Sequence, residues 1–229
     1  MTIKHWPPDE RPREKLLGHG GMVLSDAELL AIFIGSGCGG QDAVTLARGW
    51  LQQFGSLQGL LRAPAAVLQQ LPGVGPARLA LVLAAAELGR RCVLAQYCGQ
   101  GEPVSLEQAA MMFSIHLARS GKETLAVLFL DSHHAALALE DIAVGTLDRV
   151  TVYPRELLRR ALMLNAGAVI FGHNHPSGDP QPSAADVRVT FVLEEALAVA
   201  GIKLVDHLVV GGGQWVSIAA TGQWRPLTE

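Results

Sequence analysis

The chain has 229 residues, 49% of them hydrophobic, and a mean hydropathy of +0.28. This content is enough for a compact core and excludes a disordered chain. No apolar run approaches the roughly 18 residues that a membrane-spanning helix needs. The polar, proline-rich start of the chain also lacks the apolar stretch of a secretory signal. We therefore expect a cytoplasmic protein without a membrane partner.

The formal net charge of −3 is unevenly divided. Residues 1–100 hold 9 Lys and Arg against 7 Asp and Glu, which gives +2, whereas residues 101–229 hold 9 against 14, which gives −5. A charge of +2 does not by itself indicate nucleic-acid binding. The three cysteines, Cys38, Cys92 and Cys98, are expected to be reduced, with a disulfide between Cys92 and Cys98 as the alternative.

Helical patterns dominate the first hundred residues. Apolar residues at three- and four-residue spacing predict four helices, over 26–34 with Ser25 as N-cap, 43–55, 64–70 and 76–91. The segment 95–105 then loses this periodicity and gathers Gly, Pro and Ser. We therefore predict a small all-α domain over residues 1–98 and a second domain over residues 103–229.

Strand and helix patterns alternate in the second domain, as in α/β proteins. The predicted elements are a helix near 105–119, strands over 123–131 and within 134–152, a helix over 154–166, a strand over 168–172, a helix over 183–200, and strands over 202–211 and 214–222. The strand over 168–172 runs directly into His173. The C-terminal end of a strand is the customary place for ligands in α/β sheets.

Residues 171–186, FGHNHPSGDPQPSAAD, combine metal-binding side chains with turn residues. His173 and His175 project to the same side of an extended backbone, where both rings can reach one metal ion. Asp186 follows His175 by eleven residues and lies on the first turn of the next helix. Catalytic zinc sites usually have three protein ligands and one open position. The spacing therefore predicts one Zn²⁺ per chain, bound by His173, His175 and Asp186.

A simpler interpretation concerns Ser183 and Asp186. A serine followed three residues later by an acid is also a helix-capping signature. Capping accounts for neither histidine, however, and it can coexist with metal binding. His207 lies within an apolar strand and is expected to be a satisfied core residue, with support of a metal ligand as the alternative.

The first domain contains LPGVGPARLALVLAAAELGRR, residues 71–91, in which Gly73 and Gly75 separate two helical patterns as in a helix-hairpin-helix. Glycines let such a hairpin come close to a phosphate, and free N–H groups at the start of the next helix can bind it. Arg78 would add a charged contact. Such hairpins also pack helices or bind proteins, so both DNA and protein remain candidate partners of this domain.

The residues also carry a family resemblance. HNHPSGDPQPSAAD matches the JAMM metalloprotease pattern without a gap, and YPRELLRRALMLNA, LVDHLVVG, RPREKLL, LSDAELLA and FGSLQGLL resemble the bacterial RadC family over nearly the whole chain. The resemblance implies an all-α helix-hairpin-helix bundle followed by an α/β, cytidine-deaminase-like JAMM/MPN domain with a mixed sheet. IGSG at 34–37 departs from the Arg-Thr-Gly of the family. Asn174 replaces the Ser or Thr of deubiquitinating JAMM enzymes, so their substrates are not carried over.

The resemblance further implies a general base and an oxyanion donor. Glu123 matches the position of the catalytic glutamate of the family, with Glu140 and Glu156 as rivals, and Ser183 would hydrogen-bond the oxyanion. Zinc lowers the pKa of bound water to about 7. The implied activity is hydrolysis of an amide, peptide or isopeptide bond in a protein or peptide substrate.

Two other functions are kept as alternatives. In one, the chain is a DNA-binding accessory protein of repair or recombination, and the metal only stabilises the fold. In the other, the second domain is a nuclease, although such enzymes usually employ two metal ions. The sequence indicates no oligomeric state.

Overall fold

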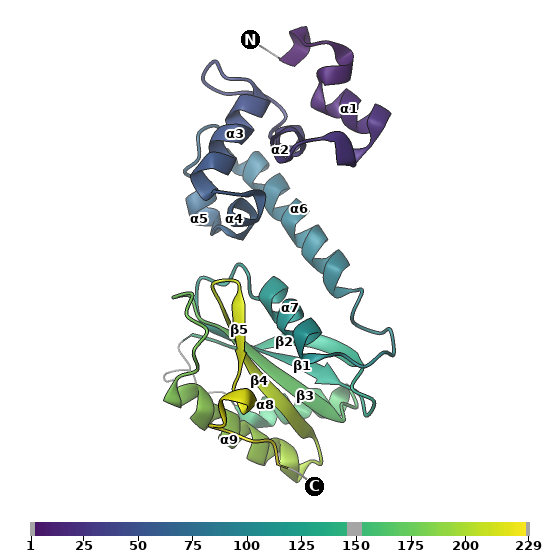
Figure 1. Cartoon of the computed structure of the whole chain (residues 1–229), viewed down its shortest axis with the longest axis vertical. Helices are drawn as coiled ribbons and strands as arrows, with labels where there is room; N and C mark the ends of the chain where they lie inside the picture. Colours follow the sequence, from purple (N-terminus) through teal and green to yellow (C-terminus); the bar gives the residue numbers. More distant parts are fainter. Residues whose placement is uncertain (1–2, 146–152, 228–229) are drawn as a thin grey trace. The chain divides into compact units, whose positions relative to one another are not determined.

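The computed structural model describes residues 3–145 and 153–227. The chain divides into two compact units, Met1–Gly89 and Arg90–Glu229 (Figure 1). Helix α6 (Pro76–Leu94) crosses this division, and the segment 95–105 follows it. Within the described ranges, no helix is both long and apolar enough to cross a bilayer.

The first unit is helical, as predicted. It contains 3-10 turns at Ile3–His5, Pro8–Glu10 and Gly21–Val23, together with α1 (Pro12–His19), α2 (Asp26–Ile34), α3 (Ala43–Phe54), α4 (Leu57–Arg62), α5 (Ala65–Leu68) and the first part of α6. Its core includes Leu30, Trp50 and Leu60. Two of these helices were not predicted, because α1 has no continuous apolar face and α4 is only six residues long.

Side-chain caps begin three of these helices, among them α4, where the Ser56 hydroxyl accepts the Gly59 N–H at 3.0 Å. The Ser25 hydroxyl accepts the Glu28 N–H at 3.3 Å, and the Glu28 carboxylate accepts the Ser25 N–H at 2.8 Å. This reciprocal pair is a capping box, so the predicted N-cap of α2 is confirmed. At the start of α3, the Asp42 carboxylate accepts the N–H of Thr45 at 2.8 Å.

The second unit has helices and strands in alternation. Its elements are α7 (Leu106–His116), β1 (Thr124–Leu130), β2 (Ala136–Val144), α8 (Pro154–Met163), β3 (Ala168–Asn174), α9 (Ala184–Val199), β4 (Lys203–Gly211), β5 (Gln214–Ser217) and a 3-10 turn at Ala219–Thr221. The predicted strand material within 134–152 is β2 as far as Val144, and residues 146–152 lie outside the described ranges.

The last strand is shorter than the predicted 214–222. The buried carboxylate of Asp206 accepts the Ser217 hydroxyl at 2.6 Å and the Ala219 N–H at 3.3 Å. These hydrogen bonds turn the chain away from the sheet directly after β5.

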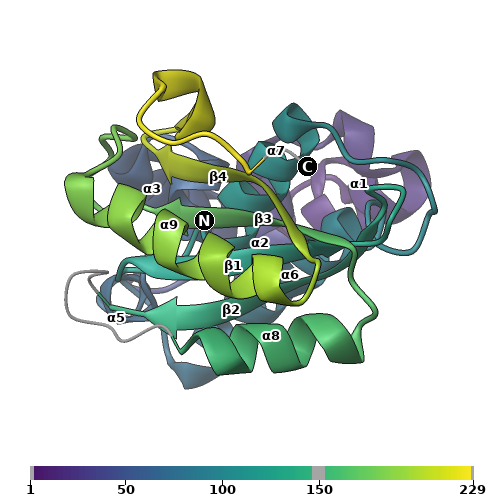
Figure 2. The same cartoon turned by 90° about the horizontal axis from the view of Figure 1, so that it is seen from below.

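The sheet is mixed, as expected. Its strand order is β2-β1-β3-β4-β5, and β3 runs parallel to β4 while the other neighbouring pairs are antiparallel. Helices α8 and α9 cover one face and α7 covers the other (Figure 2). Val169 and Phe171 belong to the core under α9, whereas Ala168 and Ile170 belong to the core under α7. Successive residues of β3 therefore serve opposite faces of the sheet.

The segment after β5 anchors α9. Glu194 of α9 is only 4% exposed, and its carboxylate accepts the Trp224 indole N–H and the Leu227 N–H, both at 2.7 Å. A buried carboxylate needs such donors to offset its lost hydration. Residues near the end of the described chain thus fix the helix that carries Asp186.

Candidate metal centre

The end of β3 is shaped by close packing on α7. A Cβ atom on Gly172 would lie 2.3 Å from the ring of Phe113, so only glycine fits between the strand and this helix. The strand continues to Asn174, two residues beyond the predicted end. His173 is consequently an ordered strand residue, fully buried on the α9 side.

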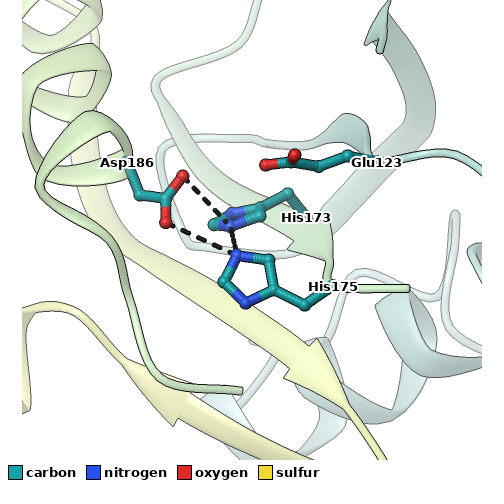
Figure 3. A group of neighbouring side chains, drawn as sticks. All are labelled: Glu123, His173, His175 and Asp186. Carbon is teal, nitrogen blue, oxygen red and sulfur yellow. Dashed lines mark hydrogen bonds and ion pairs between the residues drawn. The ribbon is translucent and has the colours of Figure 1, made fainter. Parts of the chain in front are cut away.

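Four side chains with ligand atoms meet at this strand end (Figure 3). One ligand atom from each of Glu123, His173, His175 and Asp186 lies within 4.8 Å of the others. The two histidine Nε2 atoms are 3.0 Å apart, and Asp186 presents Oδ1 to His173 at 3.4 Å and Oδ2 to His175 at 3.5 Å. The structure thus brings together the three predicted ligands and the predicted base.

Asp186 has two tasks at the start of α9. Its Oδ2 accepts the Ser183 N–H at 2.6 Å, while the Ser183 hydroxyl accepts the Asp186 N–H at 3.2 Å. The capping interpretation is therefore confirmed, and the same carboxylate also faces both histidines. The cap holds Asp186 in place because two hydrogen bonds fix its position on the first helical turn.

The loop after β3 orients His175. Its Nδ1 lies 2.7 Å from the carbonyl oxygen of Asp179, which can only accept, so Nδ1 carries a hydrogen. The loop packs closely on the β4–β5 turn, since a Cβ on Gly211 would lie 3.0 Å from the Gly178 backbone. Glycines at this contact let the loop fold back toward the cluster.

His207 and Thr190 extend the cluster into the core. His207, on β4 opposite Phe171 of β3, is fully buried, and its Nε2 lies 2.8 Å from Nδ1 of His173. The sequence favours a core residue at this position, but His207 also contacts a predicted ligand because β3 and β4 are neighbours. Thr190 was missed. Its only sequence signal is its position one helical turn after Asp186, on the buried face of α9.

Asn174 holds the segment that carries Glu123. Its side-chain oxygen accepts the Thr124 N–H at 2.9 Å, and its amide group donates to the carbonyls of Ser120 and Lys122 at 3.2 and 3.1 Å. The Glu123 carbonyl also accepts the N–H of Gly145 at 2.7 Å. The residue that departs from the deubiquitinating pattern thus ties the strand of the histidines to the loop of Glu123.

The rival glutamates lie elsewhere. Glu140 of β2 accepts from Arg160 Nε at 2.7 Å, and Glu156 is an exposed residue in the first turn of α8, 3.0 Å from Arg159. Neither belongs to the group of ligand atoms around His173.

Burial and hydrogen bonding oppose one another in the electrostatics of the cluster. Burial raises the pKa of Asp186, but its bonds with His173 and His175 outweigh this and hold the pKa far below its usual range. The bond with Asp186 raises the pKa of His175 against the effect of burial. Complete burial lowers the pKa of His207, helped by the nearby His173. Asp186 is therefore anionic and His207 is neutral at neutral pH.

In the first unit, the three hairpin residues differ in their surroundings. Gly73 has φ +75°, and a Cβ there would lie 2.8 Å from Cβ of Cys38. Gly75 has a φ that other residues also adopt, and a Cβ there would meet nothing within 4 Å. Arg78 donates to the Gly73 carbonyl at 2.6 Å and to the Ser36 carbonyl and hydroxyl at 2.8 and 2.6 Å. The guanidinium of Arg78 thus links the hairpin to the IGSG segment.

Two family models match the chain. Residues 104–223 match the RadC-like JAB domain, and residues 3–80 match the UPF0758 N-terminal domain. A UPF0758 protein of Xanthomonas campestris pv. campestris is 51% identical over 227 residues, which cover 99% of this chain and 100% of the relative. A UPF0758 protein of Stenotrophomonas maltophilia is 50% identical over 228 residues, 99% of this chain and 97% of the relative. The chain therefore belongs to the RadC (UPF0758) family, and its second unit contains a RadC-like JAB domain.

Proposed function

We propose that this chain is a zinc-dependent hydrolase that cleaves an amide, peptide or isopeptide bond in a protein or peptide substrate. The observation that carries the proposal is the meeting of Glu123, His173, His175 and Asp186 at the end of β3. With it we propose two finer fold assignments, a cytidine-deaminase-like arrangement for the second unit and a helix-hairpin-helix for residues 71–91.

The donor set fits a small tetrahedral cation. Zinc bonds of about 2.05 Å to nitrogen or oxygen place two ligand atoms about 3.3 Å apart. The corresponding separations here are 3.0 Å between the two Nε2 atoms and 3.4 and 3.5 Å from these atoms to the Asp186 oxygens. Two imidazoles and one carboxylate are also a ligand combination typical of catalytic zinc, with a fourth position left for water.

The remaining residues supply proton transfer and charge stabilisation. When bound, zinc acts as a Lewis acid that activates water for attack on a carbonyl carbon. The partly buried Glu123 would take a proton from the attacking water and return it to the leaving amine. Ser183 accepts a hydrogen bond from the Asp186 N–H, so its own hydroxyl hydrogen is available to donate to the oxyanion.

Metal content and turnover can be tested separately. Elemental analysis should find about one zinc per chain in the wild type and far less in the His173→Ala/His175→Ala double variant. A zinc-supplemented screen on a peptide and protein library should then find turnover that Glu123→Gln removes without loss of zinc. Glu156→Gln, at the exposed rival position, is the matched control and should keep both.

Each outcome bears on a different part of the proposal. Equal zinc in wild type and double variant would contradict the ligand assignment. Full turnover by Glu123→Gln would contradict its role as base. Zinc binding without turnover on any substrate would favour the structural role of the metal in a DNA-binding accessory protein.

A second candidate activity, DNA binding by the first unit, is favoured by Gly75. Packing within the chain explains Gly73, whose φ and close neighbours require glycine, but it does not explain Gly75. Gly75 stands directly before α6, where its carbonyl accepts the Leu79 N–H at 3.0 Å, and the missing side chain leaves the backbone at this helix start open to a ligand. We propose that the start of α6 beside Gly75 contacts a DNA phosphate through backbone N–H groups. Arg78, bound to Gly73 and Ser36, would support the hairpin.

DNA binding of this kind depends steeply on salt and little on sequence. Gly75→Ala should weaken binding to duplex DNA at low salt and lower the stability by no more than about 1 kcal/mol, because a methyl group there meets nothing within the chain, although glycine is preferred to alanine directly before a helix. Gly49→Ala on α3, where a methyl group also meets nothing, is the control and should bind like the wild type. No binding at low salt would instead favour a protein partner.

A further inference from the structure

A line of buried polar side chains connects His173 to the backbone of α9. Nδ1 of His173 lies 2.8 Å from Nε2 of His207, and Nδ1 of His207 lies 2.6 Å from the hydroxyl oxygen of Thr190. The Thr190 hydroxyl in turn lies 2.7 Å from the backbone carbonyl of Asp186. Both histidines and Thr190 are 0% exposed, so these groups must satisfy one another.

The backbone carbonyl of Asp186, at the end of this line, determines the direction of every hydrogen bond in it. A carbonyl oxygen only accepts, so the single hydroxyl hydrogen of Thr190 is donated to Asp186. The Thr190 oxygen must then accept from Nδ1–H of His207. A neutral imidazole has one N–H, which leaves a lone pair on Nε2 of His207, and that lone pair accepts from Nδ1–H of His173. His173 is thereby left with a lone pair on Nε2.

We propose that Thr190 and His207 are positioning residues, which hold His173 in the Nδ1–H tautomer so that its Nε2 lone pair faces the metal. Hydrogen bonding at one ring nitrogen determines which nitrogen can bind a metal. The inference rests on the metal binding proposed above, and it is independent of the hydrolysis.

The tautomer of His175 is set by a single hydrogen bond to a backbone carbonyl. Nδ1 of His175 donates directly to the Asp179 carbonyl, so its Nε2 also carries a lone pair when the ring is neutral. The two Nε2 atoms and the Asp186 carboxylate then face one another at 3.0 to 3.5 Å with no hydrogen between them. When both rings are neutral, these three facing acceptors favour a bound cation.

Asp186 takes part at both ends of this line of hydrogen bonds. Its carboxylate faces His173 and His175, and its backbone carbonyl is the acceptor that sets the direction of the bonds between Thr190, His207 and His173. The first turn of α9 therefore supplies a ligand and also orients another ligand on β3. The direction that this carbonyl sets is the one that metal binding through Nε2 of His173 requires.

The imidazole tautomers can be measured directly. Two-bond ¹H–¹⁵N correlation spectra of the full-length protein, with zinc and after chelation, should show His207 as the Nδ1–H tautomer in both states and His173 as the Nδ1–H tautomer with zinc. Thr190→Val has nearly the same shape but lacks the acceptor, so His207 should lose its preference for Nδ1–H. Thr190→Ser restores the hydroxyl and should restore the wild-type spectrum.

Zinc affinity gives a second readout, by competition of zinc alone against a chromogenic chelator. Thr190→Val should weaken zinc binding about 10- to 100-fold, the range found for outer partners of ligands, and Thr190→Ser should recover most of it. Ser217→Ala, which removes another buried hydroxyl next to β4, is the control and should change neither tautomers nor affinity. His207 as the Nε2–H tautomer in the wild type would overturn the inference, as would unchanged zinc affinity in folded Thr190→Val. Absence of hydrolysis in all variants would bear only on the proposed function.

Discussion

At the residue scale, the absence of a side chain at Gly172 lets β3 pack closely on α7 and so positions His173. Gly172 lies between the ring of Phe113 and the fully buried His173. We predict that Gly172→Ala destabilises the second unit by about 1–3 kcal/mol, the usual cost of overpacking, and weakens zinc binding because β3 must shift. Denaturant unfolding and chelator competition measure the two effects. Gly121→Ala, with no neighbour within 4 Å, should change stability by less than about 0.5 kcal/mol.

Glu28 predicts a pH dependence for the first unit. Burial opposes its ionisation, but hydrogen bonds from Lys15 and Ser25 outweigh this and lower the pKa from 4.5 to about 2. A pKa that is lower in the folded than in the unfolded state stabilises the fold above the unfolded value. This contribution should be lost as the pH falls from 4.5 toward about 2. Urea midpoints over this range should decrease in the wild type and change less in Glu28→Gln.

At the scale of elements, a substitution at the start of α9 can distinguish the capping role of Asp186 from its proposed role as a metal ligand. Asn at position 186 keeps an oxygen that can accept the Ser183 N–H but removes the negative charge. We predict that Asp186→Asn stays folded, with a stability change below about 1 kcal/mol, and loses more zinc affinity than the roughly 10- to 100-fold expected for an outer partner. Circular dichroism and chelator competition test this. Wild-type zinc affinity in this variant would leave Asp186 with its capping role alone.

The serine of the same cap gives the complementary result. Ser183→Ala removes the acceptor for the Asp186 N–H, so it should lower stability by about 1 kcal/mol. It should keep zinc, because no ligand atom is lost. Once a substrate is found, turnover should fall about 100-fold or more, as for a missing oxyanion donor. Unchanged turnover would argue against the oxyanion role.

Local chemistry made the regular elements predictable. The cap at Ser25, Pro154 at the start of α8, and the turn residues around β3 are short-range signals, and the structure contains the corresponding helices and strand. Short or weakly patterned elements such as α4 were missed. The early end of β5 was also unpredictable, because it depends on the distant carboxylate of Asp206.

The site was predictable to the extent that its residues are close in sequence. His173, His175 and Asp186 follow one motif, but the contact of His207 with His173 depends on the parallel pairing of β3 with β4. Periodicity describes the face of a strand and not the identity of its neighbour. Thr190 was missed for the same reason, since its partner lies on another element.

For the whole molecule, the division into two units predicts separate responses to zinc. The three proposed ligands and Glu123 all lie in Arg90–Glu229, while Met1–Gly89 has its own core. We predict two calorimetric transitions, one for each unit. Zinc should raise the midpoint temperature of only one of them, because it adds about 2.7 kcal/mol to the free energy of unfolding of the second unit when free zinc exceeds the Kd 100-fold. The His173→Ala/His175→Ala variant is the control and should show no shift. One transition that moves as a whole would mean that the two units unfold together.

The hydrogen bonds from Trp224 and Leu227 to the Glu194 carboxylate bear on the order in which the chain folds during synthesis. Glu123 through Asp186 are translated well before Trp224 and Leu227, the donors that neutralise the buried carboxylate of α9. Until these donors have been synthesised, the Glu194 carboxylate lacks both of its hydrogen bonds, so the packing of α9 on the sheet is expected to be incomplete. The nascent chain is therefore expected to contain all the proposed ligands before they are held in their final arrangement. Capture of the metal is expected to follow synthesis of the C-terminal segment and not to guide the earlier folding of β1 and β3.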